Sequence, residues 1–331
     1  MIEARHLRVL RAVARTGSFS AAARELGCTQ PAISQQMKAL EKSVDTPLVV
    51  RSGRGMQLSE AGRVLLKHAT GILAGLSAAE EEVAAIAGLR AGRVRLVSFP
   101  TASSTLVPPA VARLRDSHPG VRVSLVDAEP PESLAMLRGG ECEVALAFRY
   151  PQASGAAAPA PAHGTPREAR AEANLEAQQL SAGTDWSDLV VTPLLDDPLV
   201  GLLPAGHRLA GRGGPVELAE LASEQWIAGC PQCRGHLVEL CAGAGFEPRI
   251  DFATDDYPAV VGLVAAGLGV AVLPGLALQS VRPDGVVTVA VHAATGAPAV
   301  RQVVALTLPD LAEVPAVALM LERLAGAGPG R

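Results

Sequence analysis

No segment of this sequence is apolar for long enough to cross a membrane. The longest apolar stretch, Ala259–Pro274, reads AVVGLVAAGLGVAVLP and is shorter than the roughly 20 residues that a membrane-spanning helix needs. Arginines interrupt every apolar run near Met1, so the pattern of a signal peptide is missing. The five cysteines, an odd number, argue against a secreted disulfide framework. These absences predict a cytoplasmic protein without a membrane partner.

The motifs of common α/β enzymes are missing as well. The chain has no Gly-x-Gly-x-x-Gly after its first β-rich run, no P-loop and no Gly-x-Ser-x-Gly. We therefore expect no enzymatic activity, no catalytic residue and no cofactor. With 331 residues, of which 49% are hydrophobic and 19% charged, the chain is long enough for two or three globular domains.

The net charge of −4 is unevenly distributed along the chain. Residues 1–95 hold 14 Lys and Arg against 8 Asp and Glu, whereas the remainder holds 15 against 25. The first part is thus basic, as a module that faces phosphates requires, and the second part is acidic. The two parts are expected to have different functions.

Two short helical patterns follow one another closely in the basic part. Phe19, Ala22, Ala23 and Leu26 are spaced as one face of a helix, with Ser18 as a plausible N-cap and Gly27 as a stop. The second pattern starts with Pro31 in its first turn and has an inward stripe of Ile33, Met37 and Leu40. Its other side carries Ser34, Gln35 and Lys38, the polar row that a helix in a DNA major groove needs. A first helix at residues 6–17 completes the predicted helix-turn-helix domain.

The next two segments extend this DNA-binding unit. Residues 48–59 read as two short strands around the turn SGRG, and this hairpin carries Arg51 and Arg54 near its tip. Beside a helix-turn-helix, such a wing would place cations on DNA; the alternative is an ordinary basic surface hairpin. Residues 59–89 contain no proline and have one apolar stripe that includes Leu65, Leu73 and Val83. A helix of this length, about 45 Å, should pair with its own copy in a dimer.

From residue 93 the pattern becomes β-α-β-α-β, which predicts a parallel sheet covered by helices. A segment rich in Pro, Ala and Gly follows at residues 151–186 and is interpreted as a surface loop. Residues 189–195 and 197–204 read as two strands, and further strands and helices reach a last helix at 314–324. Because one small sheet cannot take so many elements, we expect two α/β lobes with a cleft between them.

The sequence resembles the LysR-type transcriptional regulators across nearly its full length. The resemblance is carried by FSAAARELGCTQPAISQQMKALE, LVVRSGRGMQLSEAG, VPPAVARLRDSHPGVRVSLVD and LVAAGLGVAVLP. The resemblance implies a winged helix-turn-helix at 1–58 and a dimerising linker helix at 59–90. It also implies a two-lobed α/β effector domain, like a periplasmic binding protein, at 91–331. Lobe 1 would span about 91–195 and 265–331, and lobe 2 about 196–264. The segment 151–186 departs from the compact crossover usual in the family.

The resemblance also implies partners: double-stranded operator DNA, a small-molecule effector, a second copy in a homodimer or a dimer of dimers, and RNA polymerase if the protein is an activator.

Gln35 stands where the family often has arginine, and glutamine can pair with adenine whereas arginine favours guanine. The expected DNA-binding residues are Thr29, Gln30, Pro31, Ser34, Gln35, Lys38, Arg51 and Arg54.

The effector is expected where chain segments leave the strands. Residues 98–104 follow the first strand and open a helix, so their N–H groups and hydroxyls could hold an anion, although ordinary helix capping would need the same residues. Asp255 and Asp256 disfavour a strongly acidic ligand unless Arg149 or Arg234 offsets them. The expected effector-binding residues are Ser98, Thr101, Ala102, Ser103, Phe148, Cys230 and Thr254.

The stretch CPQCRGHLVELC places Cys230 and Cys233 at the spacing of a zinc site. His236 and Cys241 would lie about 140° apart on the helix that follows, so all four residues could not easily bind one metal, and we assign no metal. Two interpretations of Cys230 and Cys233 stay open: a redox switch formed by the two thiols, or a pair of ordinary buried thiols. Cys28 and Cys142 are expected in cores. A nucleoid-type DNA protein without a ligand is the rival function, but it would not need a large acidic domain.

Overall fold

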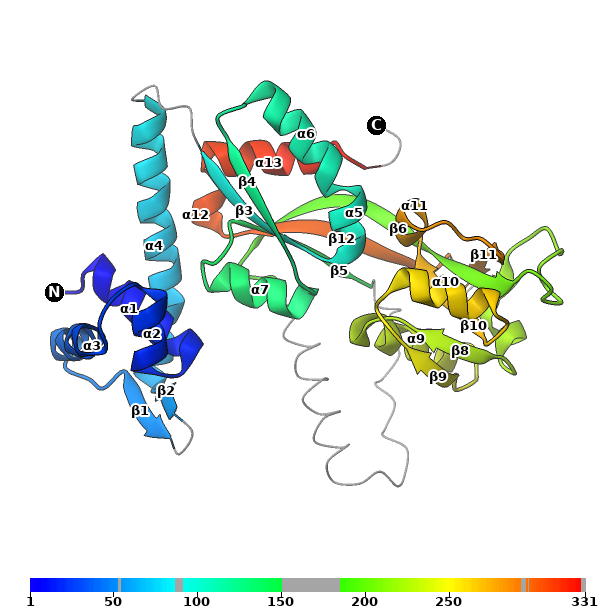
Figure 1. Ribbon diagram of the computed structural model, residues 1–331, viewed down its shortest axis with the longest axis horizontal. Helices are drawn as coiled ribbons and strands as arrows, with labels where there is room; N and C mark the ends of the chain where they lie inside the picture. Colours follow the sequence, from blue (N-terminus) through cyan, green and yellow to red (C-terminus); the bar gives the residue numbers. More distant parts are fainter. Residues whose placement is uncertain (53–54, 87–91, 151–184, 293–295, 297, 329–331) are drawn as a thin grey trace.

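The computed structural model describes residues 1–52, 55–86, 92–150, 185–292, 296 and 298–328. Arg54 and nearly all of the segment 151–186 therefore lie outside the described residues. Figure 1 shows a small helical head at the foot of one long upright helix, with a larger α/β domain beside it.

The head is built from three helices: α1 (Ala4–Thr16), α2 (Phe19–Glu25) and α3 (Gln30–Val44). Gly17 ends α1 in the left-handed region at φ 65°, which a residue without Cβ adopts easily. The Ser18 hydroxyl then accepts a hydrogen bond of 3.0 Å from the Ala21 N–H and so caps α2. Pro31 lies in the first turn of α3, as expected.

The apolar stripes of these helices meet in one small core. Ile33, Met37 and Leu40 of α3 are buried and pack with Leu10 of α1 and Ala22 of α2. Three helices with complementary stripes thus bury one face of α3, and the same packing leaves its opposite face in solvent.

The expected hairpin follows the helices as β1 (Val49–Ser52) and β2 (Gly55–Leu58). The two strands are antiparallel, with Val49 opposite Leu58. The Met56 N–H donates a 2.8 Å hydrogen bond to the Gly17 carbonyl, which fixes the hairpin against the end of α1. The hairpin therefore extends from the head as a wing whose direction is set by a backbone contact.

Helix α4 (Glu60–Ile86) is long and carries the expected apolar stripe, of which the single chain covers only one part. Ala69 and Leu73 are buried against Leu7 of α1. Ile72, Leu76 and Val83 are exposed on the single chain. At 100° per residue, these three side chains lie within about 40° of one another around the helix.

The first half of the α/β domain contains the predicted parallel unit. Strand β3 (Arg93–Ser98) pairs in parallel with β4 (Arg122–Asp127) on one side and β5 (Val144–Arg149) on the other. The connections run through helices α5 (Pro100–Thr105), α6 (Val107–Ser117) and α7 (Pro130–Arg138).

One strand, β6 (Val190–Pro204), runs through both halves of the domain. The sequence suggested two strands here, but the chain stays extended because the first part of β6 pairs with β12 (Val300–Thr307) and the last part pairs with β10 (Val270–Pro274) and β11 (Val286–His292). In the described part of the chain these strands belong to one ten-stranded sheet, in the order β4-β3-β5-β12-β6-β10-β8-β9 with β11 and β7 beside β6.

The remaining elements complete the second half and the return to the first. They are β7 (Val216–Glu217), the 3-10 helix η1 (Leu218–Leu221), β8 (Gln225–Ala228), α9 (Pro231–Gly243), β9 (Arg249–Ala253), α10 (Tyr257–Ala265), α11 (Ala277–Ser280), α12 (Pro309–Ala312) and α13 (Pro315–Ala325). Strands β10 and β11 pair with β6 and β8 and therefore belong to the second half of the domain. The chain re-enters the first half only at β12, and not near residue 265 as the sequence suggested.

The close approach of α4 to the wing gives a test of the fold. An alanine Cβ at Gly62 would lie 2.1 Å from the Leu48 carbonyl oxygen, whereas one at Gly75 of the same helix would meet nothing within 4 Å. We expect Gly62→Ala to lower the free energy of unfolding by about 1–3 kcal/mol through overpacking. Gly75→Ala should raise it by roughly 0.5–1 kcal/mol, the usual gain in helix propensity. Urea denaturation of both variants checks this; equal effects would contradict the packing of α4 on the wing.

Candidate functional site

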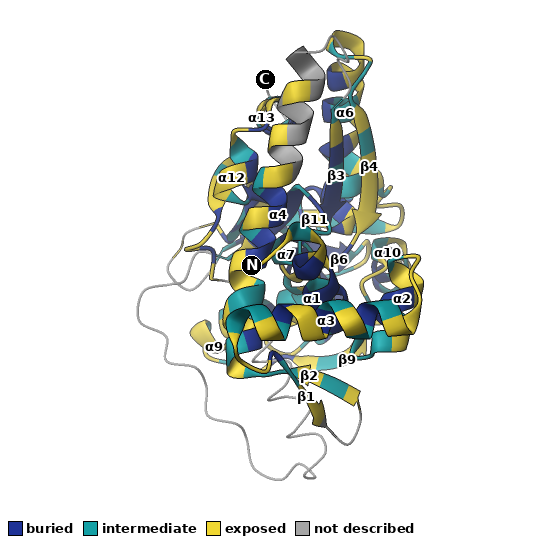
Figure 2. Cartoon of the chain, turned by 90° about the vertical axis from the view of Figure 1, so that its left-hand side faces the viewer, coloured by how far each residue is buried: buried dark blue, intermediate teal, exposed yellow. Residues whose placement is uncertain are grey.

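The outer face of α3 is the polar surface that the sequence predicted. Ile33, Met37 and Leu40 are turned into the head, whereas Gln35 and Lys38 are exposed. Figure 2 shows exposed and buried residues alternating along this helix. Of the other expected contact residues on this helix and before it, Thr29, Gln30 and Pro31 are exposed and Ser34 is half-buried.

The wing adds a cation to the same end of the head. Arg51 is exposed on β1, next to the turn of the hairpin. Arg54 lies outside the described residues. A polar helix face and an adjacent basic hairpin form the arrangement with which winged helix-turn-helix domains contact the bases and the backbone of DNA.

A buried arginine lies where the two halves of the α/β domain meet. Arg301 of β12 is fully buried, and its Nε donates a 2.8 Å hydrogen bond to Oδ2 of Asp197 on β6. Its Nη2 donates to the Thr101 hydroxyl at 2.8 Å. The second carboxylate oxygen of Asp197 accepts the Leu276 N–H at 3.0 Å. Four segments that are distant in sequence are thus joined by one charged pair.

The surroundings of Arg301 leave part of its guanidinium without a partner. Its carbon Cζ lies 4.7 Å from the Phe148 ring centre and 5.1 Å from that of Phe99. Nη1 is buried and has no hydrogen-bond partner among the described residues, and the same holds for Oε2 of Glu129. Burial raises the pKa of Glu129, and the Arg301 charge opposes part of this rise. Buried polar atoms without partners mark a place where a water or ligand oxygen would be stabilised.

The expected effector-binding residues divide into two groups. Ser98, Thr101, Ala102, Phe148 and Cys230 are buried, and several of them surround Arg301. The Thr101 hydroxyl is taken up by Arg301, and the Ala102 and Ser103 N–H groups donate to the Phe99 carbonyl at 3.0 Å. Thr101 therefore positions Arg301, and these two amides are not free for an anion.

The other expected residues make local contacts. The Ser103 hydroxyl binds Asp127, and the Thr254 hydroxyl accepts the Asp256 N–H at 3.2 Å. Arg149 donates to the Gln302 side chain and lies over the Trp186 ring. The cation at the junction is Arg301, a residue that sequence reasoning missed.

Sequence reasoning missed most of this junction because its residues look ordinary in the sequence. Arg301 interrupts the apolar strand VRQVVALT and Asp197 lies in LLDDP, but neither forms a motif with a near neighbour. A charged residue within a strand that is otherwise apolar was the available signal, since such a residue must be paired when buried. The pairing partner, which is 104 residues away, could not be read from spacing.

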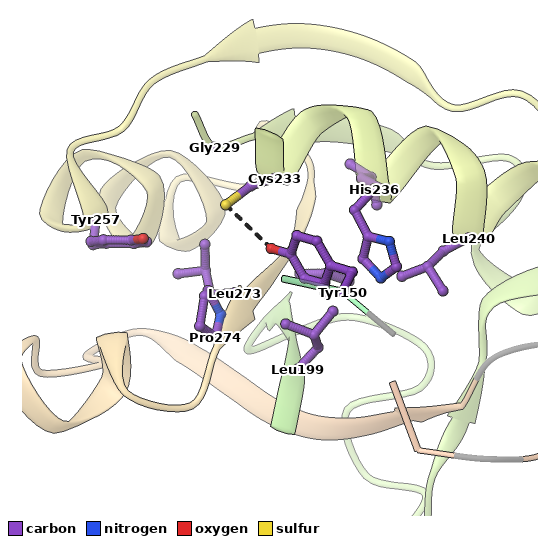
Figure 3. A pocket seen from close by; sticks show the side chains of 11 residues that line it. Tyr150, Leu199, Gly229, Cys233, His236, Leu240, Tyr257, Leu273 and Pro274 are labelled. Atoms are coloured by element: carbon purple, nitrogen blue, oxygen red, sulfur yellow. Dashed lines mark hydrogen bonds between the residues drawn. The ribbon is translucent and has the colours of Figure 1, made fainter. Parts of the chain in front are cut away.

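The cysteines of CPQC lie beside this junction. Cys230 precedes α9 and Cys233 is in its first turn, with their sulfur atoms 3.1 Å apart. Tyr150, which follows β5, donates its hydroxyl to Cys233 Sγ at 3.4 Å and stacks on His236 at 3.7 Å between ring centres (Figure 3). Burial lowers the pKa of His236 to about 4.

Two other cysteines, Cys142 and Cys28, differ in their burial. Cys142 is buried, as expected, but Cys28 is exposed in the corner before α3, so its assignment to the core was wrong. The corner is too shallow to cover it, because the chain turns there from α2 directly into the exposed start of α3. Within the described residues, no group of three or more His, Cys, Asp or Glu side chains could hold a metal ion.

A larger cavity lies between the head and the α/β domain. Its volume is about 770 Å³, and its lining combines Arg11, Arg63 and Lys67 with Glu141 and Asp310. Two of the residues that line the cavity, Arg15 of the head and Glu141 of the α/β domain, form an ion pair of 3.7 Å. The lining of this cavity mixes cations with carboxylates, so it selects no ligand of one sign.

A winged helix-turn-helix head, a long helix and a two-part α/β domain with a buried polar junction define a DNA-binding regulator that responds to a ligand. The described residues include no helix that is long and apolar enough for a membrane span. Comparison with protein families supports this class: the LysR substrate binding domain matches residues 87–159 and 177–328, and the bacterial regulatory helix-turn-helix of the lysR family matches residues 4–63. The chain belongs to the LysR family of transcriptional regulators, and it is not an enzyme.

Curated relatives extend over most of the chain. The probable HTH-type transcriptional regulator LrrA of Synechococcus elongatus is 29% identical over 325 residues, which are 98% of this chain and 96% of the relative. The HTH-type transcriptional regulator ShiR of Corynebacterium glutamicum is 31% identical over 277 residues, 82% of each protein. LysR regulators bind operator DNA and small-molecule effectors and act as oligomers, and this is the general function of the chain.

Solved structures share the fold. A full-length OxyR variant from Pseudomonas aeruginosa is similar with a TM-score of 0.69 at 18% identity, over 98% of this chain and 95% of that one. Full-length CbnR complexed with its target DNA is similar with a TM-score of 0.55 at 21% identity, over 99% of this chain and 100% of that one.

The contact between Thr101 and Arg301 predicts a stability effect. Thr101→Val should leave Arg301 Nη2 buried without an acceptor and lower the free energy of unfolding by about 1–3 kcal/mol. Thr105 lies on the same helix but only donates to the Thr101 carbonyl, so Thr105→Val is the matched control and should change stability by less than about 1 kcal/mol. Chemical denaturation of both variants measures the difference. A Thr101→Val protein as stable as the control would mean that Thr101 does not hold Arg301.

Proposed function

We propose that this regulator reads operator DNA with the outer face of α3 and contacts the phosphates with its wing. The observation that carries the proposal is the division of α3: three apolar residues are buried in the head and the polar row is left in solvent. The proposed contact residues are Thr29, Gln30, Pro31, Ser34, Gln35, Lys38, Arg51 and Arg54.

Within this set the residues differ in function. Gln35 is exposed in the middle of the polar row and can form a two-point contact with a base, most simply adenine. Lys38 and Arg51 are exposed cations, which bind phosphates irrespective of sequence. We infer that Gln35 contributes specificity and that the cations contribute affinity.

The exposed part of the α4 stripe is the proposed dimer contact. Ile72, Leu76 and Val83 are exposed on one side of a helix about 40 Å long, and the single chain does not cover them. A second copy of α4 would bury this face and bring two heads to two half-sites. The chain would then act as a homodimer or as a dimer of dimers.

The effector is proposed to bind at the junction of the two halves, next to Arg301. The free Nη1 of Arg301 can donate to a carboxylate, a phenolate or another acceptor, while Phe99 and Phe148 contact its apolar part. The cavity at the head is larger, but its lining mixes cations with carboxylates. The junction is favoured because it contains a buried donor without a partner.

A ligand that holds the halves together can reach the DNA only through the head and the dimer. The head contacts the α/β domain through Arg15 and Glu141, and α4 packs against α12. We propose that the effector favours one arrangement of the heads and thereby one operator geometry. If this arrangement activates transcription, RNA polymerase is a further partner. The site of action would be the cytoplasm, where operator DNA is found.

Gln35→Ala tests the recognition helix. We expect binding to an operator, taken from the DNA just upstream of the gene, to lose about 1–3 kcal/mol and to tolerate any base at one position of each half-site. Arg51→Ala is the comparison: it should weaken all sequences alike and lower the salt slope of binding by about one. Footprinting and titration with base-substituted operators measure both effects.

Two outcomes would contradict this assignment. If Gln35→Ala weakened specific and random DNA equally, α3 would not read bases. If the wild-type protein bound every DNA with the same salt-driven affinity, the rival function as a nucleoid-type protein would be favoured.

The dimer contact predicts different effects for two apolar residues of α4, one exposed and one buried. Val83→Glu places a charge on the exposed face, so we expect folded monomers that bind the operator more weakly. Leu73 is buried against α1 inside the same chain, so Leu73→Glu should destabilise the head itself. Light scattering together with thermal unfolding separates the two effects. A Val83→Glu protein that remains dimeric would place the dimer contact elsewhere.

A further inference from the structure

The two cysteines at the start of α9 are arranged for chemistry with each other. Cys230 Sγ and Cys233 Sγ are 3.1 Å apart, and the thiol of Cys230 donates to the sulfur of Cys233. A disulfide bond is 2.03–2.05 Å long, so the atoms need to approach by only about 1 Å to form it. The pair follows directly after β8 and lies beside the junction of the two halves.

The two thiols have unequal surroundings. Cys233 Sγ accepts hydrogen bonds from the Cys230 thiol and from the Tyr150 hydroxyl at 3.4 Å. The hydrogen bond from Cys230 lowers the pKa of Cys233, and the nearby Arg301 charge acts in the same direction. The same hydrogen bond and burial raise the pKa of Cys230. Cys233 is therefore the more acidic thiol of the pair, and Cys230 is the less acidic one.

A small cavity gives access to Cys233. It is lined by Tyr150, Cys233, His236 and Tyr257 together with leucine, valine and proline side chains (Figure 3). The space open to the centre of a water molecule is about 20 Å³, enough for about one or two waters. A small peroxide fits such a space, whereas a peptide-sized disulfide does not.

From these contacts we propose that Cys230 and Cys233 form a dithiol site that a small hydroperoxide oxidises to a disulfide. The Cys233 thiolate attacks the terminal oxygen of the hydroperoxide: a sulfur–oxygen bond forms, the oxygen–oxygen bond breaks, and the leaving oxygen takes a proton to become an alcohol, or water if hydrogen peroxide reacts. The Cys230 sulfur then attacks the Cys233 sulfur, and the hydroxyl leaves with the Cys230 proton as water. Two thiols and one hydroperoxide give one disulfide, one alcohol and one water.

Tyr150 is a positioning residue in this chemistry. Its ring stacks on His236, and its hydroxyl donates a hydrogen bond to the Cys233 sulfur. Formation of the disulfide removes the thiolate that accepts this hydrogen bond. Because Tyr150 follows β5 and Cys233 belongs to α9, the site lies on a contact between the two halves of the domain.

The test uses the full-length protein with Cys28→Ser, which removes the exposed thiol and with it disulfides between molecules. The reduced protein receives one equivalent of hydrogen peroxide, and oxidised glutathione in a parallel sample. Free thiols are then alkylated and the peptides are analysed by mass spectrometry. We expect a bond between Cys230 and Cys233 with hydrogen peroxide and little with glutathione. The peptides of Cys142 and Cys241 serve as internal controls, since burial raises the pKa of both to about 12.

Two variants separate the two steps. Cys230→Ser should stop at the sulfenic acid of Cys233, which dimedone traps, and Cys233→Ser should give no adduct at residue 230. Tyr150→Phe should slow the loss of the Cys233 thiol about fivefold, the factor that one ordinary hydrogen bond supports. Because the wild-type peptide analysis needs no variant, the proposal stays testable even if a variant does not fold. It is overturned if Cys230 and Cys233 remain reduced, or if they react no faster than Cys142 and Cys241.

Discussion

The ion pair of Arg301 with Asp197 is the interaction on which the α/β domain depends. Arg301 and Asp197 face each other across β12 and β6, and the pair also reaches Thr101 and the Leu276 N–H. Because removing one partner of a buried pair leaves an unpaired charge, which costs about 3–5 kcal/mol, the four segments must keep their relative positions. The continuous strand β6 carries this constraint from one half of the domain into the other.

The same buried arginine lies beside both the proposed effector site and the thiol pair. The guanidinium uses Nε and Nη2 within the protein and leaves Nη1 as the donor for a ligand. Its charge also favours the thiolate of Cys233 and so lowers the pKa of that thiol further than the hydrogen bond from Cys230 does alone. If the proposed effector binds there, one buried cation would stabilise both an anionic ligand and an anionic sulfur at the contact between the two halves.

The local elements could be predicted from the sequence, but the junction could not. Ser18, Gly17 and Pro31 mark helix ends by rules that need only neighbouring residues, and the stripe of Ile33, Met37 and Leu40 defines the buried face of α3. The continuous course of β6 depends instead on partners such as β12, which follow about a hundred residues later, and the same holds for the pairing of Arg301. Periodicity predicted the apolar stripe of α4, but the part that packs on α1 has the same composition as the part left exposed, so the sequence could not tell the two parts apart.

The most direct test is a thermal-shift screen of small carboxylates and phenolates on the wild-type protein and on the double variant Arg301→Met/Asp197→Leu. Replacing both charges with apolar side chains of similar volume is often neutral for stability, so the double variant should fold. If Arg301 Nη1 holds the effector, compounds that raise the melting temperature of the wild type should have no effect on the double variant. A folded double variant that is stabilised by the same compounds to the same extent would contradict the assignment of the effector to Arg301.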